Sequence, residues 1–173
     1  MVYKTLDMKL LLFLLFSLSL QAQVSNFTVE NNNLIWSKVY NDSVSAENLL
    51  KIVRTKGKFD QINLANNEIN FTLQYSSSDL KPYGYKYMTG AIFLQTGGTC
   101  IGLIEFKENR YKVSVYNIKI NPDSSEDSEE YPLSEYALKK GEIKKIGTIQ
   151  KALEFYDGYL TDVFSSKTVN KDW

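Results

Sequence analysis

The pattern of apolar and polar positions begins with an unbroken apolar run near the start of the chain. Residues 10–16 are all apolar and follow Met8 and Lys9, and the polar segment after them begins at Gln21-Ala22-Gln23. A charged flank, a short apolar core and a small residue before a polar start are typical of a secretory signal. We therefore expect residues 1–22 to be a signal peptide that is cleaved after Ala22, with translation starting at Met1 or at Met8. A retained membrane anchor and a core helix are the alternatives.

The next segments alternate between the strand and helix periods. Residues 34–40 are β-branched and aromatic, which predicts a strand. Ser45 is a good N-cap for a helix over residues 46–56 that stops at Gly57. Strands are then predicted over residues 59–64 and 69–75, joined by a hairpin at Asn66-Asn67.

Three further strands and two tight turns follow. The pattern predicts strands over residues 91–95, 99–107 and 110–120, with turns at Gly97-Gly98 and Glu108-Asn109. The connection over residues 76–87 is longer and mixes turn residues with three tyrosines. We expect that loop to project from the sheet.

The last third of the chain contains opposite charge clusters and the clearest helical period. Residues 121–131 form a predicted acidic loop, and four lysines at 139, 140, 144 and 145 form a basic patch after it. Large apolar residues then recur at intervals of three and four, which predicts a long amphipathic helix; they are Ile146, Ile149, Leu153, Tyr156, Leu160 and Val163. The polar tail over residues 165–173 is expected to fray.

These elements predict one α+β domain over residues 23–173, with its core over about 26–164. The order is strand, helix, five strands and helix, so we expect a largely antiparallel sheet of about six strands, one face of which the long helix can cover.

Composition excludes several kinds of chemistry. The chain has 20 basic and 20 acidic residues, no histidine and one cysteine. The near-neutral charge argues against a nucleic-acid or anionic-membrane binder. Without histidine, the usual Ser-His-Asp and Cys-His systems and the commonest zinc ligand are missing. One cysteine permits no internal disulfide, and Cys100 is expected to be a buried apolar residue in its strand.

Carboxylate chemistry is the catalytic alternative that remains. Glu105 is the acid that we place inside the sheet, and its expected neighbour across the hairpin is Lys112, so an exposed ion pair is the simpler interpretation. The acidic loop lacks the ligand spacing of a calcium-binding hand and is interpreted as solvated. No metal and no cofactor are predicted.

Two surfaces are candidates for binding. The first is the loop with Tyr83, Tyr85 and Tyr87, because tyrosine gives large contact area with little loss of entropy. The alternative is that these rings cover the sheet edge or begin a strand. The second is the polar face of the sheet, predicted to consist mainly of Asn, Thr, Gln and Ser with one or two lysines; its members include Asn70, Thr72, Gln74, Lys112 and Ser114.

Three segments carry a family resemblance: residues 34–40, Gly57-Lys58-Phe59-Asp60, and the hairpin over residues 107–115. They resemble exported Bacteroidota proteins of unknown function that have a TATA-binding-protein-like fold. The resemblance covers roughly residues 26–164. It implies a curved antiparallel sheet with both helices on one side and the other side exposed, and it implies no established activity.

We therefore expect an exported protein, periplasmic or secreted and soluble, with no membrane span after signal cleavage. Its expected role is that of a non-enzymatic binding module of the cell envelope, with an envelope protein or a glycan as partner and no nucleic acid. A carboxylate-dependent hydrolase and a self-associating structural protein are the alternatives.

Overall fold

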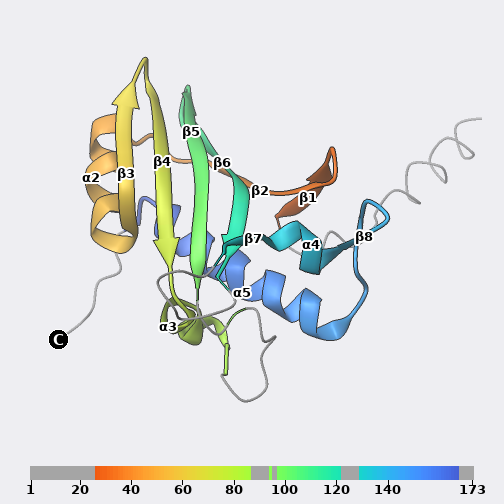
Figure 1. Ribbon diagram of the computed structural model, residues 1–173. Helices are drawn as coiled ribbons and strands as arrows, with labels where there is room; N and C mark the ends of the chain where they lie inside the picture. The colour runs from red at the N-terminus through yellow and green to blue at the C-terminus, as the bar shows by residue number, and fades with distance from the viewer. Residues whose placement is uncertain (1–25, 87–93, 95–96, 122–128, 168–173) are drawn as a thin grey trace, which may run out of the picture.

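A seven-stranded antiparallel sheet with helices on one of its faces forms the fold (Figure 1). The computed structural model describes residues 26–86, 94, 97–121 and 129–167. The strand order is β1-β2-β6-β5-β4-β3, and β7 pairs with the end of β6. The strands are β1 (Phe27–Glu30), β2 (Asn33–Tyr40), β3 (Lys58–Ala65), β4 (Glu68–Tyr75), β5 (Gly98–Lys107), β6 (Arg110–Ile120) and β7 (Tyr131–Pro132). The α+β class and the antiparallel sheet are confirmed.

Helix α2 (Ala46–Lys56) has the bounds and the caps that the sequence predicts. The side chain of Ser45 accepts a hydrogen bond from the backbone N–H of Asn48 at 3.3 Å, and Glu47 lies in the first turn, where the helix dipole favours an anion. At the other end, the N–H of Gly57 donates to the carbonyl oxygen of Val53. Leu49 and Val53 are fully buried, so this helix is held by its apolar face.

Asparagine pairs form two of the hairpin turns. Asn66 and Asn67 have φ of 51° and 60° and join β3 to β4, as predicted. Asn31 and Asn32 have φ of 50° and 61° and join β1 to β2. Consecutive left-handed residues match the twist of a two-residue hairpin, and Asn tolerates this conformation. Strand β1 was not predicted, although its turn carries the same pair of residues.

The prediction of a hairpin at Gly97-Gly98 is wrong. Gly98 already belongs to β5 and lies opposite Tyr75 of β4 and Ile120 of β6. Because β5 has β4 on one side and β6 on the other, no position beside it remains for a strand at residues 91–95. Of those five residues the structure describes Leu94, which is buried, and the other four lie outside the described residues. The two glycines allow close approach of the backbones, since a Cβ atom at Gly98 would collide with the carbonyl oxygen of Lys119.

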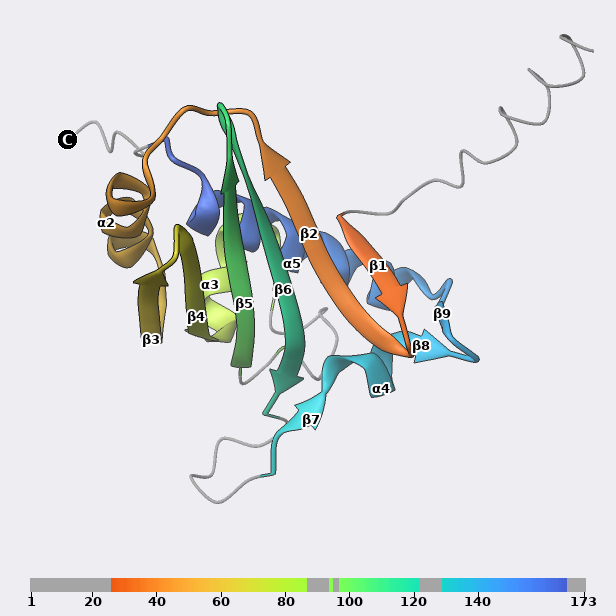
Figure 2. The same cartoon turned by 90° about the horizontal axis from the view of Figure 1, so that it is seen from above.

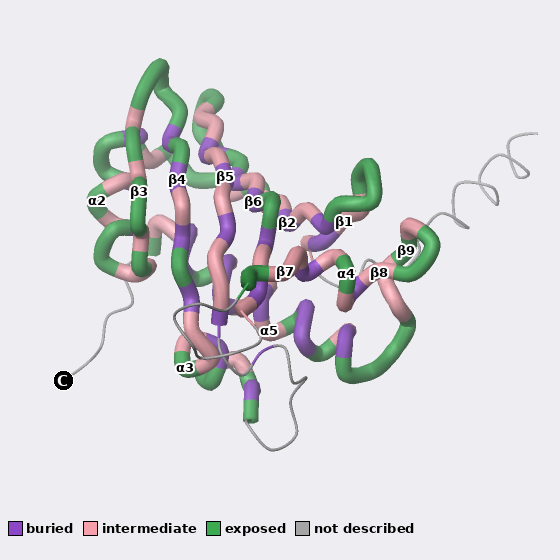
Figure 3. The backbone as a smooth tube through the Cα atoms, viewed as in Figure 1, coloured by how far each residue is buried: buried purple, intermediate pink, exposed green. Residues whose placement is uncertain are grey.

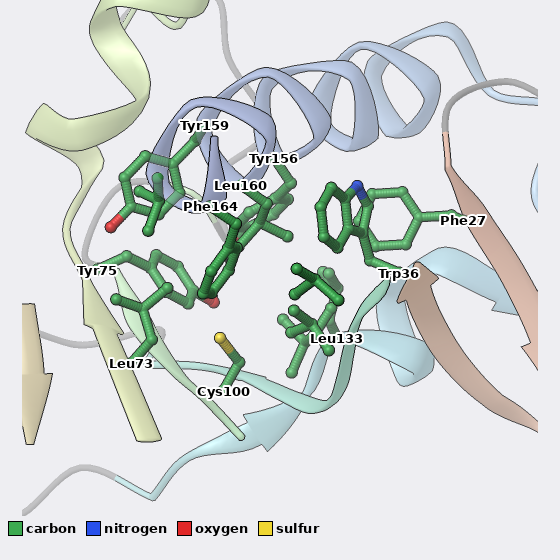
Figure 4. Packing of buried hydrophobic residues seen from close by; sticks show 14 of the residues in the cluster. Phe27, Trp36, Leu73, Tyr75, Cys100, Leu133, Tyr156, Tyr159, Leu160 and Phe164 are labelled. Atoms are coloured by element: carbon green, nitrogen blue, oxygen red, sulfur yellow. The ribbon is translucent and has the colours of Figure 1, made fainter. Parts of the chain in front are cut away.

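Helix α5 (Gly147–Phe164) covers the apolar face of the sheet and lies behind it in Figure 2. Its buried side chains include Tyr156, Leu160 and Phe164, which meet Leu73 and Trp36 from the sheet (Figure 4). The rings of Phe71 and Phe164 lie 4.7 Å apart, centroid to centroid. The predicted helix is confirmed except at its start, because Ile146 precedes the first helical residue and is 54% exposed.

Shorter elements complete the structure. They are α3 (Ser77–Leu80), the 3-10 turn η1 (Lys81–Tyr83), α4 (Leu133–Ala137) and the hairpin of β8 (Leu138–Lys139) with β9 (Glu142–Ile143). Leu80, Leu133 and Ala137 join the same core as α5, so these helices add to one layer.

The described part of the tail is held in place. Lys56 Nζ donates to the carbonyl oxygen of Ser165 at 2.5 Å, and the backbone N–H of Ser166 donates to the Tyr111 hydroxyl at 3.1 Å. Fraying is therefore wrong for residues 165–167. The predicted signal peptide at residues 1–22, most of the acidic loop and the end of the tail lie outside the described residues.

Candidate binding face of the sheet

The face of the sheet that points away from α5 is the candidate site, and we call it the open face. Side chains alternate between the two faces of a strand, and in Figure 3 buried and less buried positions alternate along the central strands. Among the described residues, no helix packs on this side. Its main members are Ile35, Ser37, Val39, Asn70, Thr72, Gln74, Ile101, Leu103, Glu105, Lys112, Ser114 and Tyr116.

The polar residues predicted for this face lie on it. In β4, Asn70 and Gln74 are exposed and Thr72 is half-buried, whereas Ile69, Phe71, Leu73 and Tyr75 on the other side are buried. Lys112 and Ser114 of β6 share this side, with Ser114 opposite Leu103 and Lys112 opposite Glu105. These residues therefore form one continuous surface across three strands.

An apolar stripe through the middle of the open face was not predicted. In one row across the strands, Thr72 lies opposite Ile101, which lies opposite Tyr116. In the next row, Asn70 lies opposite Leu103. Ile35, Ile101 and Leu103 are half-buried, while Tyr116 is 38% exposed and Val39 of β2 is 51% exposed. The expectation of a mainly Asn, Thr, Gln and Ser face is thus correct for β4 and wrong for β5. The nearly continuous apolar run of β5 was the available signal, because such strands are apolar on both faces.

The tyrosine loop does not form an exposed cluster. Tyr85 is 2% exposed and belongs to the core, with its ring 6.3 Å from that of Phe155. It therefore cannot contact a partner from this position, and its ring belongs to the packing against α5. Tyr87 lies outside the described residues.

Tyr83 is half-buried, and its side chain contacts helix α5. Its hydroxyl donates to Oδ2 of Asp162 at 2.8 Å, and its ring lies 6.3 Å from that of Tyr159. Burial and then the hydrogen bond to the Asp162 carboxylate raise the pKa of the Tyr83 hydroxyl above its usual range. This side chain holds the 3-10 turn against α5.

A pocket with a volume of about 300 Å³ lies at the end of the open face near the turn at Glu108-Asn109. It is lined by Val39, Glu105, Lys107, Arg110, Tyr111 and Lys112. The predicted register of Glu105 with Lys112 is confirmed, but the expected ion pair is not formed in the described structure. Three cations and one carboxylate thus face solvent here.

A second carboxylate lies beside Glu105. Glu68 at the start of β4 is its partner across the strands. Directly opposed antiparallel residues have Cα atoms roughly 5 Å apart. Glu68 is exposed and does not line the pocket, so the two acids do not share an enclosed site.

Three further features of the described residues concern the cysteine, the metal-binding side chains and the length of the helices. Cys100 is buried, and burial raises the pKa of its thiol to about 12. No cluster of three or more metal-binding side chains occurs in the part of the chain that the structure describes. Across the same residues, every helix is too short or too polar to cross a membrane.

Comparison with known proteins identifies the fold. No protein-family model matches the sequence, and no curated protein matches it. A TBP-like protein from Parabacteroides distasonis ATCC 8503 aligns with a TM-score of 0.50 and 12% identity, over 80% of this chain and 95% of that one. A DUF4468 family protein from Bacteroides ovatus ATCC 8483 aligns with a TM-score of 0.44 and 12% identity, over 86% and 95%. The first of these likenesses confirms the fold that the sequence resemblance implies: the chain has a TATA-binding-protein-like fold.

Proposed function

We propose that the protein is an exported, non-enzymatic binding module that binds an envelope glycan on its open face. The observation that carries the proposal is the position of Tyr116. Its ring is partly exposed on the sheet face that no described helix covers, and it lies in register with Ile101 and Thr72. An aromatic ring with an apolar surround offers a platform for the C–H face of a sugar ring.

The polar residues around the stripe support a sugar as the ligand. Asn70 and Gln74 carry amide groups that both donate and accept hydrogen bonds, and Thr72 and Ser114 add hydroxyl groups. Sugar hydroxyls also donate and accept, so such side chains can pair with them on both sides of the stripe.

Export is supported by the predicted signal at residues 1–22. The test is fractionation of a Bacteroidota cell that expresses the tagged chain, with mass spectrometry of the product. We expect a processed chain that begins at Gln23 in the periplasm or the medium. An unprocessed chain in the cytoplasm would contradict the proposal.

The binding test uses the processed protein and oligosaccharides released from the cell envelope, measured by glycan array and calorimetry. We expect Tyr116→Ala to reduce affinity by about tenfold or more and Tyr116→Phe to retain most of it, because the ring is the contact. Ile146→Ala is the matched control, since Ile146 is also exposed but lies at the start of α5. If Tyr116→Ala instead alters the mass in solution and leaves sugar binding unchanged, the face mediates self-association and the proposal is wrong.

The pairing of Glu68 with Glu105 favours a second candidate, a carboxylate-dependent glycoside hydrolase. Such enzymes hold two carboxyl groups on either side of the scissile bond. The open position of the two acids argues against it, because catalytic acids are commonly activated by burial. Product analysis after prolonged incubation decides between them: intact oligosaccharide supports binding alone, and cleavage that is lost in Glu105→Gln supports the hydrolase.

A further inference from the structure

The pocket at the turn end of the open face has a regular arrangement of charges, and we call it the cationic pocket. Lys107 lies opposite Arg110, and Glu105 lies opposite Lys112. Strands are about 4.8 Å apart and alternate residues are about 7 Å apart along a strand, so the four side chains rise from the corners of a small rectangle. Val39 lies beside Lys112 and forms the apolar wall.

The three cations of this pocket have no partner among the described residues. In the described structure, the side chains of Lys107, Arg110 and Lys112 make no ion pair and no side-chain hydrogen bond. Other lysines do form ion pairs. Nζ of Lys58 lies 3.2 Å from Oδ2 of Asp79, and Nζ of Lys119 lies 3.2 Å from Oε2 of Glu130. The residues that line the pocket carry three cations against the single carboxylate of Glu105, which is a local excess of positive charge in a chain that is formally neutral. Such a site favours an anion.

The size and the mixed chemistry of the pocket limit the kind of anion. A guanidinium group binds a carboxylate through two parallel hydrogen bonds, and two lysines add further donors. Glu105 repels a second negative charge but accepts a hydrogen bond from a hydroxyl group. The exposed side chain of Val39 can contact C–H groups. A ring with one carboxylate and several hydroxyls satisfies all of these groups, whereas a polyphosphate or a nucleic acid places excess charge against Glu105.

From this arrangement we propose that the cationic pocket is a subsite for a uronic acid, so that the glycan bound by the open face is acidic. The inference rests on the proposed function, because the pocket is continuous with the open face through Lys112. Lys112 and Tyr116 are four residues apart on one strand, which is roughly 13 Å. The ligand must therefore be an oligosaccharide that reaches from the pocket to the ring.

The test compares each acidic oligosaccharide with its own neutral derivative. The probes are oligogalacturonate, alginate and hyaluronan fragments, each beside its methyl-esterified form, measured by calorimetry on the processed protein. We expect at least one uronate to bind about tenfold or more tightly than its ester, since a charged hydrogen bond contributes about this much. Its affinity should fall with added salt, and that of the ester should not.

Charge-matched variants locate the effect. Lys107→Gln/Arg110→Gln should lower the affinity for the uronate about tenfold or more and leave the ester unchanged. Lys139→Gln/Lys140→Gln removes the same amount of charge from the β8–β9 hairpin and should change neither the affinity for the uronate nor the affinity for the ester. An equal loss of uronate affinity in both double variants would show that the acid is attracted by the overall charge of the protein, and it would overturn the subsite.

The experiment distinguishes failure of the acidic subsite from failure of glycan binding by the open face. If acid and ester bind equally and Tyr116→Ala weakens both, the open face binds glycans and the acidic subsite is wrong. If no uronate in the panel binds, the subsite is also overturned, and binding of a neutral envelope oligosaccharide on the array still decides the proposed function. Competition by inorganic phosphate as strong as that by galacturonate would show a simple anion site and would overturn the sugar assignment.

Discussion

Trp36 donates its indole N–H to Oδ1 of Asp157 at 2.6 Å, which ties strand β2 to the middle of α5. The same oxygen accepts a hydrogen bond from Nδ2 of Asn26 at 2.7 Å, so one carboxylate also holds the residue that precedes β1. Trp36 is fully buried, and its N–H has no access to water. The carboxylate therefore satisfies a donor that the core would otherwise leave unpaired.

Asp157→Ala should lower the free energy of unfolding by about 1–3 kcal/mol, because it leaves the Trp36 N–H buried and unpaired. Urea unfolding followed by tryptophan fluorescence measures the change. Glu154→Ala is the control, since Glu154 is exposed on the same helix and its removal should change stability by less than about 0.5 kcal/mol. Equal losses in the two variants would show that the indole bond is not the cause.

Gly102→Ala should destabilise the sheet by about 1–3 kcal/mol through overpacking. A Cβ atom at Gly102 would collide with the Phe71 ring and with the carbonyl oxygen of Ser114. Gly147→Ala is the matched control, because a Cβ atom there has nothing within 4 Å, and the higher helix propensity of alanine should leave stability unchanged or raise it by at most about 1 kcal/mol. Thermal melts of the two variants, read by circular dichroism, test the difference in sign. A Gly102→Ala protein as stable as the parent would contradict the packing described for β5.

The glycines also show where sequence reasoning succeeds and where it does not. The helix with Ser45 as its cap and the hairpin at Asn66-Asn67 were predictable because the signal and the structure are both local. Gly97-Gly98 carried the same kind of turn signal, but these residues are glycines because two other strands approach their backbones closely. That contact is between residues far apart in the chain, and no local pattern distinguishes it from a turn.

The candidate site was predictable only in part, for a related reason. Strict alternation in β4 identified Asn70, Thr72 and Gln74 as one face. In β5, Ile101 and Leu103 are outward and Ile104 is inward, and a continuous apolar run does not say which set is buried. Likewise, the sequence could not tell that Tyr85 enters the core, because its burial depends on Phe155 of a helix some 70 residues later.

The thiol of Cys100 should be unreactive in the folded protein. It is buried, and its pKa is raised by burial to about 12, so little thiolate forms at neutral pH. A thiol-specific disulfide reagent at pH 8 should label it only as fast as the protein unfolds, and addition of urea should release one thiol per chain. Rapid labelling of the native protein would contradict the placement of β5 against α5.

Alkaline pH should unfold the protein because buried tyrosines cannot ionise in place. The Tyr156 hydroxyl donates to the Tyr75 hydroxyl at 3.2 Å, which donates to the carbonyl oxygen of Lys119 at 2.5 Å. Burial raises the pKa of both hydroxyls above the usual value of 10.0, and that of Tyr111 to about 12. Below pH 10 these tyrosines are neutral in the folded and the unfolded states, so their contribution to stability is complete. Above it the unfolded state loses protons first, and stability falls as pH rises.

Phenolate absorbance and circular dichroism recorded together between pH 9 and about 12 test this linkage. We expect a second rise in absorbance that coincides with loss of secondary structure. Tyr156→Phe removes one of the titrating groups and should make the fall in stability with pH less steep. A smooth titration of all the tyrosines while the helices persist would contradict the buried network.

Substitutions in the apolar stripe should weaken glycan binding and have little effect on the free energy of unfolding. Ile101 and Leu103 are half-buried on a face that no described helix covers, so Ile101→Thr and Leu103→Thr should each cost less than about 1 kcal/mol. Leu73→Thr, on the buried side of the neighbouring strand, should cost about 2 kcal/mol or more because it opens a cavity and buries a hydroxyl. If the stripe variants lose glycan affinity while their melting temperatures stay within a few degrees of the parent, the stripe belongs to the binding surface. If they unfold as readily as Leu73→Thr, these residues are part of the core, and the open face loses the apolar platform on which its proposed role depends.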